Sequence, residues 1–495
     1  MASKQRSRQK PENITIIHPD LGIGGAERLI IDVALALQNV GHKVTVYTSH
    51  RDTSHCFEEA RDGTLDVRVR GDRFFPASVK GRFVVLLAIL RQVCLAFELL
   101  GEAARRVEGK KGEEDDADEV FIVDQVPACV PILKILGPRW LGSRGRQRIL
   151  FYCHFPDQLL ARRGGSSLAR FVKGVYRYPF DWFEGWAMGA SDRVVANSVF
   201  TRGVVGGVFG EDRLGDVKVV YPCVDTGEKG KGGEKKDEDE DADADTEIWP
   251  GKKILLSVNR FERKKDLALA IRAFRGLDEE RRRGVRLVVA GGYDPRITEN
   301  VQYHKELDAL ATSLGLQTAT SKTVPSALSI PDSVDVLFLP SVPSAFRDTL
   351  LAKSLLLLYT PVNEHFGIVP IEAMRAGIPV LASNTGGPLE TIVEGETGWL
   401  RDATDVSAWT AVIEKVLYGL GAEELKKMSV AAKERVEAKF SLRAMGEKLE
   451  EEIGGMLNSE RRPFDGAQQL LFLLGALGVA FAVFIALVLA WVRSV

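Results

Sequence analysis

The stretch SLLLLYTPVNEHFGIVPIEAMRAGIPVLA, residues 354–382, contains three local patterns in a fixed order. Ser354–Tyr359 is a short apolar run typical of a buried strand, and Pro379–Ala382 is another. Between them, Pro370–Ala376 predicts a helix whose first position is a proline, where the missing N–H is tolerated. A strand, a loop, a helix and a second strand predict a parallel βαβ unit.

The loop of this unit carries polar residues that suit a nucleotide sugar. Glu364 precedes the predicted helix and Glu372 falls in its first turn, so both carboxylates are expected to face one crevice. Gly367 lets a ligand approach the backbone, and unpaired N–H groups at a helix start attract a diphosphate. Carboxylates accept hydrogen bonds from sugar and ribose hydroxyls. Two glutamates at this spacing also arise often by chance.

The alternation of apolar strands and helices extends in both directions from this stretch. The N-terminal half predicts strands at Asn13–His18, Lys43–Thr48, Val120–Asp124, Arg148–Cys153 and Arg193–Asn197, and a helix at Ala26–Asn39. The C-terminal half adds strands at Lys253–Asn259, Arg286–Ala290 and Val336–Pro340, and helices at Leu267–Leu277 and Asn300–Leu314. Such alternation predicts two doubly wound α/β domains, with a ligand cleft built from the C-terminal ends of both sheets.

Length and charge agree with two domains and added segments. The chain has 495 residues, too many for one compact core, and its net charge of -2 includes two acidic runs, Glu113–Glu119 and Glu234–Glu247. Without these runs the body is basic, which suits an anionic ligand, an anionic membrane surface or a mixed solvated surface. The predicted divisions are a basic tail at 1–12, an N-terminal domain at 13–222 with an acidic insertion at 108–119, an acidic disordered linker at 223–250, a C-terminal domain at 251–440 and a helix with a juxtamembrane segment at 441–466.

Residues 467–493 predict a transmembrane helix. Leu470–Val492 has no charged side chain, and as a helix it would be roughly 34 Å long, enough to cross a hydrocarbon core. Arg461 and Arg462 before it favour a cytosolic main body. A membrane-embedded hairpin and a partner-binding helix are the alternatives.

A second apolar stretch, Phe83–Leu100, is interrupted by Arg91 and Glu98. Because these charges are seven residues apart, they lie on one helical face and make the segment amphipathic rather than spanning. The sequence leaves open whether the helix lies in a membrane interface or packs on the core of its domain.

Two further constellations lie beside predicted strands. Gly24 and Gly25 belong to the run GIGGAE, where glycines and free N–H groups at a helix start suit an anion, although a plain tight turn is equally open. Arg260 and Lys265 follow the strand Lys253–Asn259, where a guanidinium and an ammonium can hold phosphate oxygens. A solvated basic loop is the alternative.

The run NEHFGIVPIEAMRAGIPVLASNTGGPLE, residues 363–390, resembles the donor-binding signature of the retaining family 4 glycosyltransferases. GIGGAER, YCHFPD and NRFERKKD resemble further segments of that family in the right order. The resemblance runs from Ile14 to the end of the C-terminal domain and is strongest to the α-1,3/1,6-mannosyltransferases of the dolichol pathway. It implies the GT-B fold, two facing Rossmann-like domains, with acceptor binding in the first and donor binding in the second.

The resemblance also implies residue roles. Glu372 holds the donor ribose, and Arg260 and Lys265 hold the diphosphate. Glu364 contacts the transferred sugar, and His154 lies near the reaction centre. The backbone of Phe366, Gly367 and Ile368 is implied to contact sugar and phosphate, while Gly24 and Gly25 face donor phosphate and acceptor.

The implied reaction is transfer of mannose with retention from GDP-mannose to mannosyl-chitobiose on dolichyl diphosphate, first α-1,3 and then α-1,6. We expect no cofactor and no metal, since no DxD-type pair stands beside the pocket. Expected partners are membrane lipids and other mannosyltransferases of the same pathway, not nucleic acid, at the cytosolic face of the endoplasmic reticulum. The alternatives are a membrane GT-B enzyme with another nucleotide sugar and a non-catalytic GT-B subunit.

Overall fold

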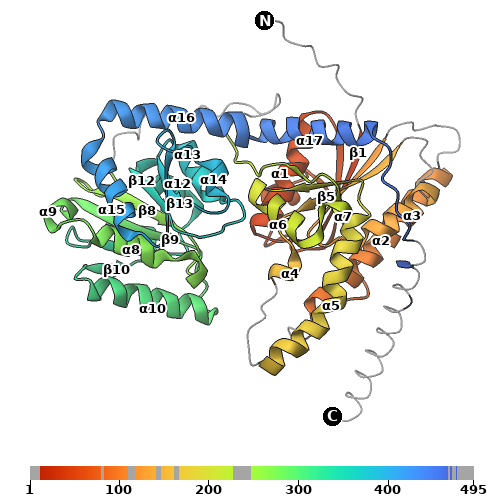
Figure 1. Cartoon of the computed structure of the whole chain (residues 1–495), viewed down its shortest axis with the longest axis horizontal. Coiled ribbons are helices and arrows are strands. Elements are labelled where there is room, and N and C mark those ends of the chain that lie inside the picture. Colours follow the sequence, from red (N-terminus) through yellow and green to blue (C-terminus); the bar gives the residue numbers. More distant parts are fainter. Residues whose placement is uncertain are drawn as a thin grey trace, which may run out of the picture. The chain divides into compact units, whose positions relative to one another are not determined.

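The computed structural model describes residues 12–79, 83–109, 118–140, 146–160, 167–226, 247–466, 469–470 and 475. The chain forms two compact units, each with one seven-stranded parallel sheet (Figure 1). The first unit comprises Met1–Asn197, Thr201–Val220 and Met445–Val495, and the second comprises Ser198–Phe200 and Tyr221–Ala444. The prediction of two Rossmann-like α/β folds is confirmed.

The sheet of the first unit has the strand order β3-β2-β1-β4-β5-β6-β7. Successive strands are added outward from β1 on one side and from β4 on the other, so the chain reverses direction across the sheet between β1 and β4. Ligands of doubly wound folds bind at the carboxyl ends of the strands at such a switch point. The strands are β1 (Asn13–Leu21), β2 (Lys43–Arg51), β3 (Asp66–Val69), β4 (Glu119–Asp124), β5 (Gln147–Cys153), β6 (Arg193–Ala196) and β7 (Lys218–Val219).

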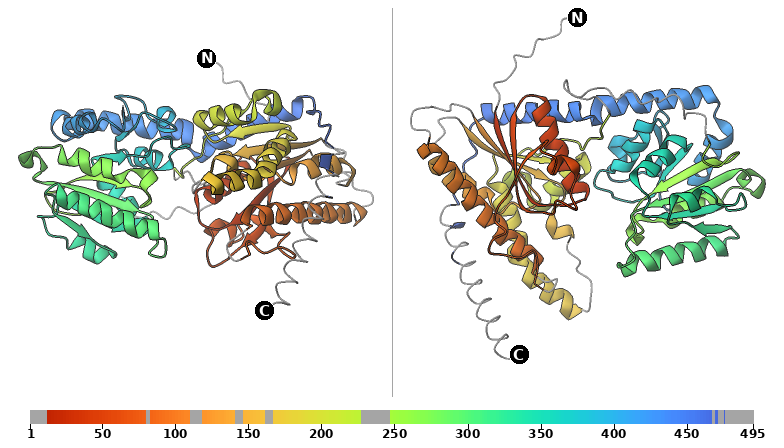
Figure 2. Two further views of the ribbon diagram at one scale, coloured as in Figure 1. Left: turned by 60° about the horizontal axis from the view of Figure 1, so that its bottom comes forward. Right: turned by 180° about the vertical axis from the view of Figure 1, so that it is seen from behind.

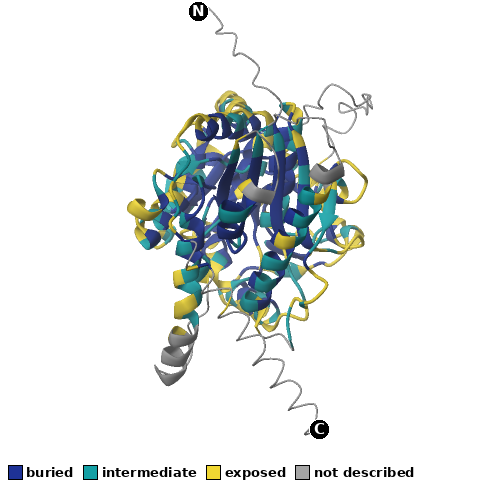
Figure 3. Cartoon of the chain, turned by 90° about the vertical axis from the view of Figure 1, so that its right-hand side faces the viewer, coloured by how far each residue is buried: buried dark blue, intermediate teal, exposed yellow. Residues whose placement is uncertain are grey.

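Helices cover both faces of this sheet. Side chains of successive strand residues point to opposite faces of the sheet. On one face, Ile17 and Val123 belong to a buried cluster that packs on α2, α3, α5 and α6. The opposite face bears His18 and Asp124. Figure 3 shows the buried strands between half-exposed helices. The helices are α1 (Gly25–Asn39), η1 (Glu58–Ala60), α2 (Val84–Gly109), α3 (Val130–Trp140), α4 (Asp157–Leu160), α5 (Ser167–Gly189), α6 (Val199–Phe209), α7 (Glu211–Leu214) and α17 (Leu442–Asn458).

The sheet of the second unit has the order β10-β11-β9-β8-β12-β13-β14, which places its switch point between β8 and β12. The run of aliphatic residues in each central strand is buried on both faces, as parallel sheets require. The strands are β8 (Lys253–Val258), β9 (Val285–Gly291), β10 (Thr318–Thr320), β11 (Val336–Pro340), β12 (Leu356–Tyr359), β13 (Val380–Ser383) and β14 (Gly398–Arg401).

The helices of the second unit form two layers. One core cluster joins the sheet to α8, α10 and α15, and the other joins it to α12, α13 and α16. The helices are η2 (Arg263–Lys265), α8 (Leu267–Arg275), α9 (Glu279–Arg282), α10 (Thr298–Ser313), α11 (Val324–Leu328), α12 (Ser344–Lys353), α13 (Ile368–Ala376), α14 (Pro388–Thr391), α15 (Val406–Glu414), η3 (Lys415–Gly419) and α16 (Ala422–Phe440).

The predicted linker at 223–250 has structured ends. Val224 is buried and pairs with Ser441, and Trp249 is buried and donates its indole N–H to the carbonyl oxygen of Ala327 at 3.0 Å. Both ends therefore belong to the second unit, while residues 227–246 lie outside the described part of the chain. Most of the predicted transmembrane helix at 467–493 also lies outside the described residues.

Helix α2 packs on the core of the first unit, which is one of the two alternatives that the sequence leaves open, and its residues Leu95, Ala96, Leu99 and Leu100 belong to the buried cluster. Arg91 is buried and donates to both carboxylate oxygens of Asp20 at 2.8 and 3.1 Å, and Glu98 accepts from the Gly71 N–H at 3.4 Å. The charged residues thus turn toward the domain, because Asp20 and the Gly71 backbone supply partners there. In Figure 2, α2 is the long orange helix. Its segment Val84–Arg105 is long and apolar enough to cross a membrane, and half of its most apolar window is buried in the fold.

Candidate active site

The loop before α13 ends in a glycine with left-handed backbone. Gly367 caps the helix with a φ of 87°, a conformation that side chains other than glycine adopt at a cost. The helix starts at Ile368, two residues before the predicted start at Pro370, so Pro370 takes its third position. The first four N–H positions have no partner within a helix, so this proline is tolerated and the N–H groups of Ile368 and Val369 remain available.

Lys265 and Glu364 form an ion pair at the switch point of the second sheet. Lys265 lies in η2 after β8, and Glu364 lies in the loop after β12, the neighbouring strand. Thr360, fully buried at the end of β12, donates its hydroxyl to the carbonyl oxygen of Lys265 at 2.6 Å. The side chains of Lys265 and Glu364 are 16% and 22% exposed, which leaves both within reach of a ligand.

Tyr359 lies beneath this ion pair. Its phenol hydrogen-bonds the Glu364 carboxylate, and burial, together with the charges of Glu364 and Glu372, holds the pKa of Tyr359 well above its ordinary value. A Cβ atom on Gly367 would approach the Tyr359 hydroxyl to 3.2 Å. Tyr359 therefore supports both the glutamate and the glycine turn.

Glu372 lies on α13 with a different cation. One of its oxygens is 3.3 Å from the guanidinium of Arg347 on α12, and the other is buried without a hydrogen-bond partner in the described structure. Burial raises the pKa of Glu372, and the charge of Arg347 partly opposes that increase. The two glutamates of the signature thus have separate positive partners, and one carboxylate oxygen can still accept a hydroxyl.

Phe366 and the loop after β13 fix the backbone of the signature. The Phe366 ring is buried and stacks on Tyr221 at 5.7 Å between centroids. The Gly387 N–H donates to the carbonyl oxygen of Glu364 at 2.8 Å, and a Cβ atom on Gly387 would lie 2.0 Å from the Phe366 oxygen. Glycine is required at 387 because the two loops touch through their backbones.

Arg260 and Ile368 are the more exposed of the predicted donor residues. The Arg260 side chain is 65% exposed, and its guanidinium is 3.8 Å from Glu262. Ile368 is 37% exposed at the start of α13. The structure therefore groups Lys265, Glu364 and Gly367 closely, and leaves Arg260 free to move toward a ligand.

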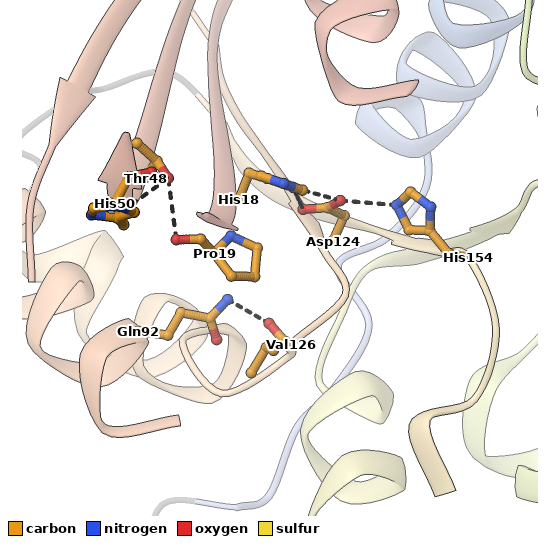
Figure 4. A network of polar contacts seen from close by, with 8 residues as sticks. All are labelled: His18, Pro19, Thr48, His50, Gln92, Asp124, Val126 and His154. Atoms are coloured by element: carbon orange, nitrogen blue, oxygen red, sulfur yellow. Dashed lines mark hydrogen bonds and ion pairs between the residues drawn. The ribbon is translucent and has the colours of Figure 1, made fainter. Parts of the chain in front are cut away.

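In the first unit, His154 is hydrogen-bonded, directly and through Asp124, to two residues that are not among the predicted site residues, Asp124 and His18. His154 Nε2 is 2.9 Å from Asp124 Oδ2, and both oxygens of Asp124 are 2.9 Å from His18 Nδ1 (Figure 4). His18 and Asp124 lie on β1 and β4, the two strands of the switch point. The sequence could have indicated both residues, since His18 and Asp124 are each a polar residue at the end of a predicted apolar strand.

Gly24 and Gly25 start α1, one residue earlier than predicted. Gly24 is extended, with a φ of -167°, and a Cβ atom there would lie 2.3 Å from a carboxylate oxygen of Glu27. The Glu27 carboxylate thus lies against this glycine, and its negative charge at the helix start is electrostatically favourable. An anionic ligand at these N–H groups would meet this carboxylate. Across the described residues, no group of three or more His, Cys, Asp or Glu side chains is arranged to hold a metal ion.

Two family models match the chain, one for each half. The model "Glycosyltransferase Family 4" matches residues 23–228, and "Glycosyl transferases group 1" matches residues 238–435. The second range contains Arg260, Lys265, Glu364 and Glu372.

Two solved structures illustrate the shared fold. A sucrose-phosphate synthase from Thermosynechococcus elongatus has a TM-score of 0.61 at 18% identity, over 90% of this chain and 99% of that one. WaaG, a glycosyltransferase involved in lipopolysaccharide biosynthesis, has a TM-score of 0.56 at 17% identity, over 89% of this chain and all of that one. At this identity the likeness establishes the fold alone.

Curated relatives are much more similar. The alpha-1,3/1,6-mannosyltransferase alg-2 of Neurospora crassa is 47% identical over 95% of each chain. The alpha-1,3/1,6-mannosyltransferase ALG2 of Saccharomyces cerevisiae is 41% identical, over 91% of this chain and 86% of that protein. The chain therefore belongs to the family of these alpha-1,3/1,6-mannosyltransferases, built from a family 4 and a group 1 glycosyltransferase domain.

Proposed function

We propose that this enzyme transfers mannose from GDP-mannose, with retention, to mannosyl-chitobiose on dolichyl diphosphate, first in α-1,3 and then in α-1,6 linkage. The observation that carries the proposal is the Lys265–Glu364 pair at the switch point of the second sheet, beside the free N–H groups of α13. A cation, a carboxylate and a helix N-terminus together suit a sugar diphosphate. The names of the relatives supply mannose and the two linkages.

In the proposed donor complex, Lys265 and Arg260 hold the diphosphate. Lys265 exchanges its Glu364 partner for phosphate oxygens, and the released Glu364 contacts the mannose. The backbone of Phe366, Gly367 and Ile368 binds sugar and phosphate, and the unpartnered oxygen of Glu372 accepts a ribose hydroxyl. His154 contacts a sugar hydroxyl, and Gly24 with Gly25 face phosphate and acceptor.

The transfer step is a substitution on one face of the mannose ring. The bond between mannose C1 and the diphosphate oxygen breaks, and its electron pair stays on the diphosphate. The acceptor hydroxyl oxygen bonds to C1 on the same face, and its proton passes to a diphosphate oxygen. Fixed cations and N–H groups stabilise the developing negative charge without rearranging. We expect this chemistry to need no metal.

The proposed setting is the cytosolic face of the endoplasmic reticulum membrane, where a lipid-linked acceptor resides. A membrane helix at 467–493 would raise the effective concentration of that acceptor. Membrane lipids, and other mannosyltransferases of the pathway, are the proposed partners.

A donor panel tests the proposal. The purified full-length chain is incubated with mannosyl-chitobiose on a dolichyl diphosphate and with labelled GDP-mannose, UDP-glucose or UDP-N-acetylglucosamine. We expect transfer from GDP-mannose only, with one α-1,3 and one α-1,6 product by linkage analysis. Transfer from a UDP-sugar alone would overturn the mannose assignment, and inactivity with every donor would favour a non-catalytic subunit.

A further inference from the structure

Three polar residues from adjacent strands form a chain of hydrogen bonds at the switch point of the first sheet. The pairing of β1 with β4 sets Ile17 opposite Val123, so His18 is level with Asp124, and Asp124 pairs with Tyr152 of β5. His154 lies two residues beyond Tyr152, so its side chain returns to the same face of the sheet. Figure 4 shows Asp124 between the two imidazole rings.

Burial differs sharply along this chain of contacts. The side chains of His18 and Asp124 are 0% exposed, whereas that of His154 is 17% exposed. A substrate can therefore contact His154 but not the other two residues. Any effect of Asp124 or His18 on the reaction must pass through His154.

The hydrogen bonds also fix the proton positions. Burial disfavours the Asp124 carboxylate, but the His18 charge and hydrogen bonds from both imidazoles more than compensate, so the pKa of Asp124 lies below its ordinary value. An ionised carboxylate only accepts hydrogen bonds, so His154 donates from Nε2 and His18 donates from Nδ1. In neutral His154 the remaining nitrogen, Nδ1, is then a hydrogen-bond acceptor.

The backbone around Asp124 is held rigidly. The residue that follows it, Gln125, has a φ of 56°, and the Val126 N–H turns back to the Asp124 carbonyl oxygen at 2.6 Å. Gln92 of α2 donates to the Val126 carbonyl oxygen at 2.5 Å and accepts from the Cys129 N–H at 3.1 Å. The carboxylate is therefore fixed from behind, as a positioning group requires.

We propose that Asp124 is a positioning residue for the transfer reaction: it fixes the ring orientation and the Nε2–H tautomer of His154, so that Nδ1 accepts a hydrogen bond from a sugar hydroxyl. His18 is the second donor that holds Asp124 in place. This inference rests on the proposed function in one respect, that His154 contacts a sugar substrate.

A double-mutant cycle separates positioning from a purely structural role. Asp124→Asn is made in the wild-type chain and in a His154→Ala background, and kcat, donor KM and the melting temperature are measured for each protein. We expect Asp124→Asn alone to lower kcat by about 10–100-fold, the usual effect of losing an orienting partner, with donor KM within about twofold. In the His154→Ala background it should change kcat by less than about twofold. An equal loss of kcat in both backgrounds, or no loss with His154 intact, would overturn the proposal.

Asp192→Asn is the matched control. The Asp192 side chain is only 2% exposed, accepts the Ile149 N–H at 2.9 Å and pairs with Lys134 at 2.5 Å, at the opposite end of the β5 strand from His154. We expect it to lower the melting temperature and to leave kcat within about twofold. A loss of kcat as large as that of Asp124→Asn would show that any buried charge in this sheet has the same effect and would contradict positioning.

A spectroscopic measurement is independent of activity. ¹⁵N-histidine labelling of the full chain, with the His154 signal assigned from a His154→Gln variant, reports the tautomer directly. We expect Nε2 protonated and Nδ1 unprotonated in the ligand-free protein. A proton on Nδ1 of neutral His154 would overturn the inference, whereas a failure of the donor assay alone would count against the proposed function only.

Discussion

Lys265 and Glu364 are 99 residues apart in the chain, yet their side chains form an ion pair across the switch point of the second sheet. In the proposed donor complex the diphosphate takes the place of Glu364 at Lys265, and the released carboxylate contacts the sugar.

Substitution of the two partners is expected to have opposite effects on donor binding. Lys265→Ala should remove the proposed charge-assisted hydrogen bond to the diphosphate, worth roughly 1.5–3 kcal/mol, so donor KM should rise about 10–100-fold. Glu364→Gln removes the ion-pair partner of Lys265. Relative to the wild type, donor KM should therefore stay the same or fall, while kcat should drop. Initial rates over a range of GDP-mannose concentrations measure both. Equal increases in donor KM for the two variants would contradict this exchange of partners.

The unpartnered oxygen of Glu372 predicts selectivity for ribose hydroxyls. The wild-type enzyme should use a 2′-deoxy or a 3′-deoxy analogue of GDP-mannose roughly 10-fold or more less well than GDP-mannose, because a buried carboxylate oxygen loses its donor. The Glu372→Ala variant should use the deoxy analogue against which the wild type discriminates and GDP-mannose equally well, both at a low rate.

Ser344→Ala on α12 is the control for this comparison, since that helix also carries Arg347. It should retain the wild-type discrimination. If Glu372→Ala kept full discrimination against both deoxy analogues, the ribose assignment would be wrong.

The sequence predicted the strands that carry the candidate site residues, but it did not predict which strands lie side by side in the sheet. His18 and Asp124 end two predicted strands, and only the order β2-β1-β4-β5 shows that they meet. Strand order depends on long-range packing, which local hydrophobic pattern does not encode. Short edge strands such as β10 and β14 were not predicted, because three or four residues carry too little pattern.

The loop before α13 was predicted more closely because its glycine and the proline that follows act locally. The helix start was still placed two residues late, since Gly367 rather than Pro370 ends the loop. Arg91 shows the reverse case. The sequence left open whether α2 lies in a membrane interface or packs on the core, and the residue that pairs with Arg91 inside the domain, Asp20, is 71 residues away in the chain. Sequence spacing cannot show such a partner.

Two glycine substitutions should act in opposite directions. In Gly387→Ala the new methyl group would lie 2.0 Å from the Phe366 carbonyl oxygen, so the signature loop must shift. We expect a loss of stability of about 1–3 kcal/mol and a larger loss of activity than of folded protein. Thermal melting and donor turnover on the same preparation measure both.

Gly203→Ala is the matched control. Gly203 is exposed in the middle of α6, and a Cβ atom there would meet nothing within 4 Å. Alanine should stabilise this helix by up to about 1 kcal/mol and leave turnover unchanged. If Gly387→Ala is tolerated as well as Gly203→Ala, the backbone contact between Gly387 and Phe366 does not constrain the loop.

Glu184 should make stability depend on pH near neutrality. Its carboxylate accepts the N–H groups of Asp157 and Gln158 at 2.7 and 3.2 Å, just after His154 in the chain. Burial raises the pKa of Glu184 from 4.5 to about 7, because it disfavours the charged form more than these hydrogen bonds favour it. The folded state therefore holds this proton more tightly than the unfolded state, and the stabilisation is present below pH 4.5 and lost as pH rises through about 7.

Replacing the carboxyl group with an amide isolates that contribution. Glu184→Gln keeps one acceptor oxygen and cannot ionise, so it should be more stable than the wild type above pH 7, by an amount on the order of 3 kcal/mol at about 1.4 kcal/mol per pH unit. The two proteins should converge toward pH 4.5. Urea unfolding of both at several pH values between 5 and 8 measures the difference in free energy of unfolding. A constant difference over that range would mean that Glu184 ionises normally, and the carboxylate would then be a simple cap for the segment that follows His154.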